Sequence, residues 1–234
     1  MRLARTLIAS TAITLSVLGA GAAGAAELVG SLTADNSFQA YISTDPDALG
    51  TEVASGGNWQ QAISFSEALA PGQTYYIHVI ADNEGGPAST PGNPDAFLGG
   101  FTLTGGTFSN GTTSLVTNTT DWSADPNPVG EQLPSGSPSW TNPTGAPVTP
   151  VTPAGNGADN IWDQDFGGPI VGIPGTAQWI WSSTDPTGEA FFSTTFTTSA
   201  APEPSQWLLF ATGILGIGGF MRTSRRTAAL RATA

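Results

Sequence analysis

Three closely spaced aspartates are the residues best suited to binding a metal in this sequence. Asp159, Asp163 and Asp165 are followed by Gly167. Carboxylates at this spacing, ended by a glycine that permits a sharp turn, can surround a hard cation such as calcium with oxygen ligands. The segment is not an EF-hand, because the third acidic position and the distal glutamate are missing. A calcium site and a solvated acidic turn both remain open as interpretations.

Two other acidic groups raise the same question. Asp45 and Asp47 flank a proline in a predicted loop, and Asp82, Asn83 and Glu84 follow a predicted strand. Loops at strand ends often present ligands, but turn formation is the favoured explanation for both groups.

Side chains for nucleophilic or acid–base catalysis are scarce. The chain has no cysteine and a single histidine, His78, which lies between Tyr76 and Ile80 on a predicted strand. We expect this ring to be packed or half-exposed rather than a general base. No Gly-x-Ser-x-Gly motif is present to expose a serine on a strained turn, and pairs of acids that could hydrolyse glycosides have no specific spacing. The sequence therefore predicts a protein that is not an enzyme.

Tryptophans could stack on sugar rings. Trp179 and Trp181 share one face of a predicted strand, so we assign them to the core, where burial of such rings is strongly favourable. Trp140 lies in a proline-rich segment and has the least structural reason to be there. A sugar-stacking platform would therefore be expected at Trp59 and Trp140.

The distribution of charge excludes several functions. The chain has six basic and eighteen acidic residues. All six arginines lie near the two ends, so residues 27–201 contain seventeen acids and neither Lys nor Arg. Nucleic-acid binding is excluded because no cationic surface exists. Lysine Schiff-base chemistry and arginine clamps on phosphate are excluded as well. Bound cations such as calcium would relieve repulsion among the carboxylates.

The N-terminus is organised as a secretory signal peptide. Arg2 and Arg5 precede an apolar run over residues 6–18 and a series of small residues over 22–26. We predict a signal peptide over residues 1–26, removed by signal peptidase, with an uncleaved anchor as the alternative.

The C-terminus combines a short motif with an apolar run. Pro202, Glu203 and Pro204 precede an uncharged segment that predicts a single hydrophobic transmembrane helix over about residues 206–221. The basic residues that follow, and that favour a cytoplasmic location, are Arg222, Arg225 and Arg226. This order of parts over residues 201–234 resembles the PEP-CTERM sorting signal of exported bacterial proteins. The resemblance implies cleavage by an exosortase; a plain membrane anchor is the alternative.

The segment between these ends, residues 27–200, is expected to form one all-β domain. Short alternating apolar runs bounded by Gly, Pro, Asn and Asp predict seven or eight strands, over residues 28–32, 38–42, 62–66, 74–81, 96–104, 112–119, 177–181 and 191–196. The run 74–81 is apolar on both faces, so we expect it to be central. Residues 125–158 contain eight prolines and predict a long surface loop, with an interdomain linker as the alternative.

A succession of motifs in this domain resembles the galactose-binding-like modules of bacterial and plant surface proteins. The motifs cover residues 34–36, 38–42, 56–59, 69–72, 77–83, 85–87 and 97–101. The resemblance implies a jelly-roll β-sandwich, a type of module that often binds glycans and in many cases carries a structural calcium. It assigns no individual sugar-binding residue.

Together these observations predict a protein exported across the inner membrane of a Gram-negative-type bacterium. We expect it to be anchored transiently by its C-terminal helix and then to reach the cell surface or the extracellular space. The favoured function is a non-enzymatic component of the envelope or extracellular matrix that associates with exopolysaccharide. A dedicated lectin-like module and a secreted glycoside or ester hydrolase remain as alternatives.

Overall fold

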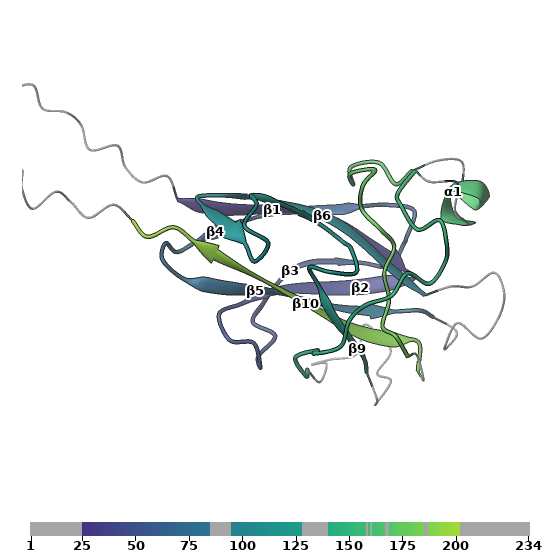
Figure 1. The fold of residues 1–234 in the computed structure, drawn as a ribbon, viewed down its shortest axis with the longest axis horizontal. Coiled ribbons are helices and arrows are strands. Elements are labelled where there is room, and N and C mark those ends of the chain that lie inside the picture. Colours follow the sequence, from purple (N-terminus) through teal and green to yellow (C-terminus); the bar gives the residue numbers. More distant parts are fainter. Residues whose placement is uncertain are drawn as a thin grey trace, which may run out of the picture. The chain divides into compact units, whose positions relative to one another are not determined.

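The protein is an all-β sandwich of two antiparallel sheets with one short helix, as the sequence predicts at this level (Figure 1). The computed structural model describes residues 25–84, 95–127, 140–157, 159, 161–166, 169–184 and 187–201. The predicted signal peptide up to residue 24 lies outside the described residues, as do the helix at 206–221, Pro202, Glu203, Pro204, Arg222, Arg225 and Arg226. Among the described residues, no helix is long and apolar enough to cross a membrane.

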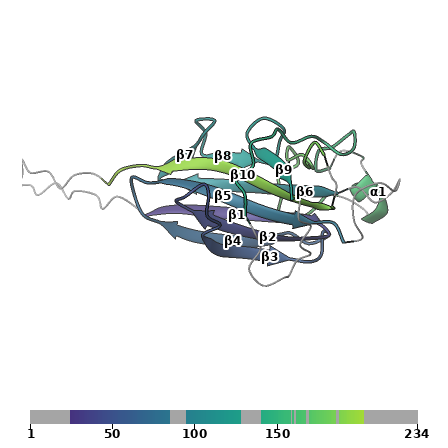
Figure 2. The same cartoon turned by 90° about the horizontal axis from the view of Figure 1, so that it is seen from below.

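The two sheets have different widths. The four-stranded sheet runs in the order β4 (Ile63–Leu69), β1 (Ala26–Asp35), β6 (Ala96–Thr104) and β8 (Ser114–Val116). The six-stranded sheet runs in the order β3 (Thr51–Gly56), β2 (Ser37–Ser43), β5 (Thr74–Asp82), β10 (Glu189–Thr198) and β7 (Gly106–Phe108), with β9 (Ser123–Pro126) also paired to β10. The helix α1 (Ile161–Phe166) lies at one end of the sandwich in both views (Figure 2).

The core lies between the inner faces of the sheets. Alternate residues of β1, β2, β5, β6 and β10 point into it. Many of these side chains are completely or nearly completely buried: Leu28, Leu32, Phe38, Ile77, Val79, Phe97, Phe101, Phe192 and Phe196. Full burial of such a side chain contributes about 1.5–3 kcal/mol. The period-two pattern of the sequence thus determines which face of each strand is inside.

Strand β5 is central, as its two apolar faces predict, because β2 and β10 pair with it on either side. Its outer face is covered by an apolar cluster of Tyr41, Ile80 and Phe191, on which Leu49 and Trp140 pack. Leu49, in the loop after β2, and Trp140 therefore cover part of the outside of the six-stranded sheet.

The outer face of β6 is covered in a similar way by residues 169–181. Gly100 makes this close approach possible, because a Cβ at this position would lie 2.4 Å from Cδ of Pro174. The register of β6 with β1 continues through Gly99 and Gly100 without a bulge.

A regular strand was predicted at residues 177–181, and the structure does not have one. Residues Gln178, Ile180 and Trp181 form only isolated bridges, to three separate segments of the chain. Trp179 and Trp181 are buried as predicted, with 1% and 2% of their surface exposed, but they belong to different clusters. Trp179 stacks on Trp162, with ring centroids 4.4 Å apart, whereas Trp181 packs in the central core. Burial does not alternate along this segment, because Trp179, Ile180 and Trp181 are all buried.

Candidate functional site

The predicted calcium residues lie in and next to α1. Asp163 is in this helix and Asp159 precedes it, and the side chain of Asp165 lies outside the described residues. Burial, followed by the negative charge of Asp159, raises the pKa of the Asp163 carboxyl. Within the described part of the chain, no three His, Asp or Glu side chains are grouped so that they could hold a metal ion. Calcium at this position stays a prediction.

Trp59 and Trp140, the predicted stacking residues, both pack against other rings. Trp59 is partly buried and meets Trp179 edge-on, with centroids 6.5 Å apart. Trp140 lies 4.3 Å from the ring of His78 and 5.1 Å from that of Phe191. Both tryptophans therefore cover parts of the sandwich and are only partly buried, and sugar stacking on them stays a prediction.

The indole of Trp140 is also fixed by a hydrogen bond. Its Nε1 donates to the carbonyl oxygen of Pro46 over 3.0 Å, which ties this residue to the loop between β2 and β3. The same loop supplies the carbonyl oxygen of Asp45, 3.4 Å from Nε2 of His78. The two segments thus form a joint lid over His78.

His78 is completely buried beneath this lid. Because the Asp45 carbonyl can only accept, Nε2 carries the proton, and Nδ1 accepts from the hydroxyl of Ser193 over 3.1 Å. Burial lowers the pKa of His78 from 6.5 to about 4, and the Asp45 carbonyl opposes this only in part. The ring is therefore neutral at ordinary pH.

A polar groove lies beside this covered region, at the edge of β10. Strands β9 and β7 pair with the same edge of β10, at residues 190–193 and 196–198 respectively, and leave a gap between them. The groove at this gap has a volume of about 450 Å³. Its lining consists of Tyr76, Ser109, Asn110, Thr120, Asp121, Trp122, Ser123, Asn142, Pro143, Ser193, Thr194 and Thr195.

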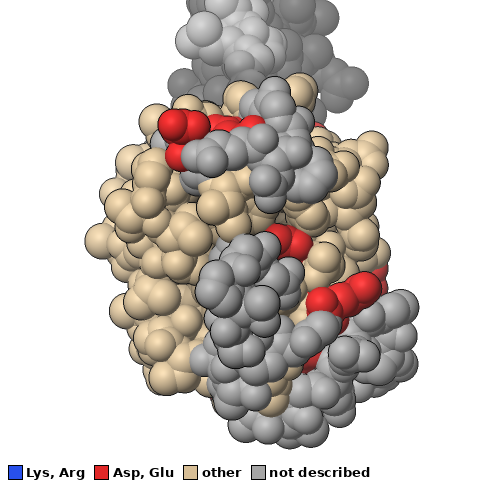
Figure 3. All heavy atoms as spheres, turned by 90° about the vertical axis from the view of Figure 1, so that its right-hand side faces the viewer, with Lys and Arg blue, Asp and Glu red and all other residues tan. Residues whose placement is uncertain are grey.

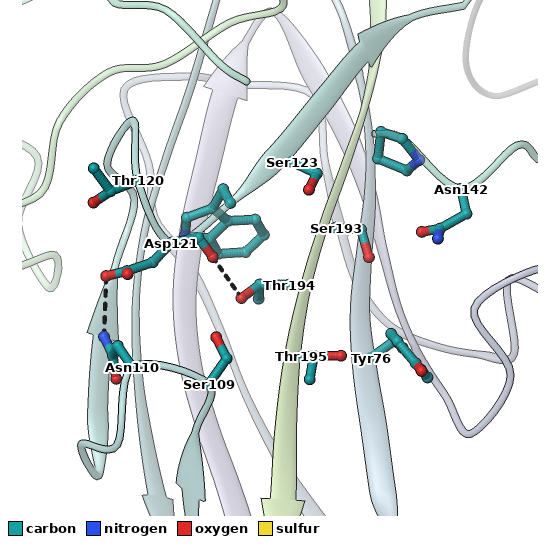
Figure 4. A pocket seen from close by; sticks show the side chains of 12 residues that line it. Tyr76, Ser109, Asn110, Thr120, Asp121, Ser123, Asn142, Ser193, Thr194 and Thr195 are labelled. Carbon is teal, nitrogen blue, oxygen red and sulfur yellow. Dashed lines mark hydrogen bonds between the residues drawn. The ribbon is translucent and has the colours of Figure 1, made fainter. Parts of the chain in front are cut away.

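Asp121 forms the acidic wall of the groove (Figure 4). Its Oδ2 accepts hydrogen bonds from the side-chain amides of Asn110 and Asn118, each over 3.0 Å. Its backbone carbonyl accepts from the hydroxyl of Thr194 over 2.8 Å. Within the described part of the chain, Oδ1 takes part in none of these bonds and is left to accept from a ligand.

The opposite wall carries hydroxyl groups. Ser193 and Thr195 alternate with Thr194 along β10, so they project to the side of the strand on which Tyr76 lies (Figure 4). The Oγ1 of Thr195 is buried and has no hydrogen-bond partner among the described residues. A hydroxyl in this state is expected to cost stability unless something outside the protein, water or ligand, bonds to it.

The segment that carries Asn142 and Pro143 is held in place by Asp125, a carboxylate that does not itself line the groove. Oδ2 of Asp125 accepts the backbone N–H of Thr144 over 2.7 Å and that of Gly145 over 3.3 Å. These bonds fix the segment that carries Asn142 and Pro143 against β9. The groove is thus preformed by the fold.

Chemically, the groove offers hydrogen bonds and no positive charge. Hydroxyl, amide and carboxylate groups can together donate to and accept from a ligand rich in hydroxyls. The described residues include no Lys or Arg, and one end of the molecule displays several acidic side chains (Figure 3). An anionic ligand would be repelled by this field.

No single stretch of the sequence indicates the groove. Its walls come from residues 76, 109–110, 120–123, 142–143 and 193–195, which are distant in the sequence. The one local signal is the turn from Asn118 to Asp121, in which the Asn118 side chain accepts from the backbone N–H of both Thr120 and Asp121.

Comparison with known proteins found no relative of this chain. No family model matches the chain, and no curated protein or solved structure matches it either. The assignment of a function therefore depends on the residues and the geometry described above.

Proposed function

We propose that this protein is an exported, non-enzymatic component of the bacterial cell envelope or extracellular matrix that contacts neutral glycans through the groove beside β10. Signal peptidase removes residues 1–26, and an exosortase processes the PEP-CTERM-like tail in the inner membrane. The basis for this delivery is the sequence of the two ends, which hold all six arginines. The domain itself would be a jelly roll of the galactose-binding-like type, which the motif succession and the two antiparallel sheets support.

The observation that carries glycan binding is the preformed groove with unused polar groups. A volume of about 450 Å³ is within the usual range for small-molecule sites of roughly 300–1,000 Å³. The lining is polar and open, which suits a hydroxyl-rich ligand lying on the surface better than an apolar one. The free Oδ1 of Asp121 would accept from sugar hydroxyls, and Asn142 and Thr195 can both donate and accept.

The charge of the exported part limits the glycan to neutral or weakly charged sugars. Residues 27–201 carry seventeen acids and no Lys or Arg, so an acidic polysaccharide would meet repulsion and find no cation to bind. Trp59 and Trp140 pack over the sandwich and do not line the groove. Recognition would therefore depend mainly on hydrogen bonds, and Tyr76 would supply an aromatic surface at the groove.

A screen of the full chain on immobilised neutral and acidic glycans tests this proposal. We expect retention on a subset of neutral glycans and weaker retention of the variant Asp121→Asn. Asp47→Asn is the matched control, because Asp47 is an exposed acid in the loop between β2 and β3 and does not line the groove. An absence of binding across the whole set, or equal loss in both variants, would contradict the proposal.

Hydrolysis is a second candidate with one observation in its favour. Ser193 lines the groove and its hydroxyl lies 3.1 Å from Nδ1 of His78, as in a nucleophile–base pair. The pKa of His78, lowered to about 4, makes the ring a poor base at neutral pH, and Trp140 covers it. Turnover of simple esters or glycosides that disappears in Ser193→Ala would support hydrolysis and count against the binding proposal.

Processing is tested separately by the intact mass of the protein released from the producing cells. Strand β1 begins at Ala26, so cleavage after Ala25 leaves this strand whole. We expect a species that lacks both the first 25 or 26 residues and the basic tail. A released protein that still ends at Ala234 would overturn the sorting proposal.

A further inference from the structure

Four polar side chains form one continuous row across the end of the six-stranded sheet. Asp82 on β5 is directly opposite Ser37 on β2 and directly opposite Glu189 on β10. Asn127 extends the row beyond β9, because its backbone N–H donates to the Glu189 carbonyl oxygen over 2.8 Å. Residues directly opposite each other in an antiparallel pair project from the same face. The sheet therefore gathers two carboxylates, an amide and a hydroxyl side by side.

All four members of this polar row are more than nine-tenths buried. Ser37 is 8% exposed, Asp82 is 2%, and Glu189 and Asn127 are 1% each. Further backbone hydrogen bonds fix the strand ends here, from Asn36 to the carbonyl of Asp82 and from Asn83 to that of Gly188. These bonds hold the backbone around the row in place, and burial keeps its side chains away from bulk water.

The charge of this row demands compensation. Two carboxylates directly opposite each other repel, and burial of each ion costs several kcal/mol. A third carboxyl, Asp95, is 1% exposed and accepts a hydrogen bond from the neighbouring side chain of Asn83. Hydrogen bonds satisfy oxygen atoms but supply no positive charge. Residues 27–201 contain neither Lys nor Arg, and the only histidine is held neutral.

Ser37 gives an independent indication that a ligand belongs here. Its Oγ is buried and has no hydrogen-bond partner among the described residues. The hydroxyl lies on the same face as Asp82, at the start of β2, and an unpartnered buried hydroxyl costs about 1–3 kcal/mol. A cation bound at the row would use this oxygen as a neutral ligand.

We propose that a calcium ion binds at this polar row, with Asp82 and Glu189 as its charged ligands and Asn127 and Ser37 as neutral oxygen ligands. Calcium accepts six to eight oxygen ligands in flexible geometry and takes amide, hydroxyl and water oxygens together with carboxylates. Two carboxylates would balance its charge.

One of the four proposed ligands also lines an open cavity, through which a cation would enter. Ser37 lines a cavity of about 290 Å³ whose lining includes the exposed Glu84. The carboxylate of Glu84 can attract a cation to this opening. This site differs from the acidic segment at Asp159–Asp163 and does not depend on glycan binding.

The test measures bound metal and thermal stability of the full chain, purified without chelator. We expect about one calcium per chain by elemental analysis, a lower Tm in EDTA, and recovery with added calcium. Calcium at about a hundred times its Kd should raise the Tm by about 5–10 °C. No bound calcium and no response of the Tm to EDTA or calcium would overturn the proposal. A second result would also overturn it: a Tm that rises on acidification from pH 8 to 5 and does not respond to calcium. In that case the buried carboxyls would be neutralised by protons and not by a metal ion.

Variants identify the site. Ser37→Ala should match the wild type in EDTA and bind calcium several-fold more weakly. Glu189→Gln should abolish the calcium response, whereas the control Asp159→Asn should retain it. Loss of the response in Asp159→Asn with full retention in Ser37→Ala would place the ion at α1 and refute the polar row as the site.

Discussion

The lid over His78 can be tested by removing Trp140. The ring of Trp140 lies 4.3 Å from that of His78, and its bond to Pro46 holds the loop that carries the Asp45 carbonyl. In Trp140→Ala, water reaches the imidazole, and the burial that holds its pKa at about 4 is relieved. We expect the pKa of His78 to rise toward 6.5, by at least about one unit.

The stability change follows from the same contacts. Loss of a fully buried tryptophan costs about 3–5 kcal/mol, and Trp140 is only partly buried, so we expect Trp140→Ala to lose about 2 kcal/mol. Trp140→Phe keeps a ring over His78 but loses the hydrogen bond to Pro46. It should cost about 1 kcal/mol and leave the pKa of His78 low.

The measurement is an NMR titration of the full chain without a histidine tag. His78 is the only histidine, so a single imidazole signal reports on it. A wild-type pKa near 6.5 would show that the ring is solvated and would refute the lid. A pKa that stays at about 4 in Trp140→Ala would show that other residues exclude the water.

The low pKa of His78 also determines how the free energy of unfolding changes with pH. Because the folded pKa of about 4 lies below the unfolded value of 6.5, the unfolded chain binds the proton first as pH falls. The contribution of His78 to the free energy of unfolding is therefore complete above pH 6.5 and lost between pH 6.5 and 4. The slope is at most about 1.4 kcal/mol per pH unit, and it should flatten in Trp140→Ala.

Two further predictions concern packing. Gly100→Ala places a methyl group 2.4 Å from Cδ of Pro174 and should lower the free energy of unfolding in urea by about 1–3 kcal/mol. The control Gly57→Ala, which has nothing within 4 Å of the added Cβ, should be nearly neutral. Equal effects of the two variants would refute the close approach. Trp162→Phe removes the hydrogen bond from Nε1 to Oδ2 of buried Asp35, over 2.9 Å, and should cost about 1–3 kcal/mol at pH 7. Because burial already raises the pKa of Asp35, this loss should shrink on acidification, and an equal loss at pH 7 and pH 4 would contradict it.

The sequence predicted those strands whose alternation is strong. The two apolar faces of β5 correctly indicated a central strand, because both sides of it are covered. Strand β3 was not predicted, since only Ala54 within it is buried and an edge strand of mainly polar residues has no apolar period. Strand β9, with four residues, is too short to show a pattern.

Contacts between distant segments could not be predicted from local patterns. Trp140 sits in a proline-rich segment that gives no sign of its partner, because His78 and Phe191 are brought to it only by the pairing of β5 with β10. The polar row has the same origin. Asp82 was noted at a strand end, but its opposition to Glu189 exists only once the register of that pairing is known.

The hydroxyl of Thr195 provides the most direct test of glycan binding at the groove. Thr195→Val removes the unpartnered Oγ1 with little change of shape, so the fold should remain stable. Thr102→Val is the matched control, an exposed threonine on a strand of the other sheet. With a neutral glycan selected from the screen, titration calorimetry of the full chain should give a Kd about 3–10-fold weaker for Thr195→Val and unchanged for Thr102→Val. An unchanged Kd in Thr195→Val together with an unchanged Kd in Asp121→Asn would show that the glycan binds elsewhere and would contradict the proposed function of the groove.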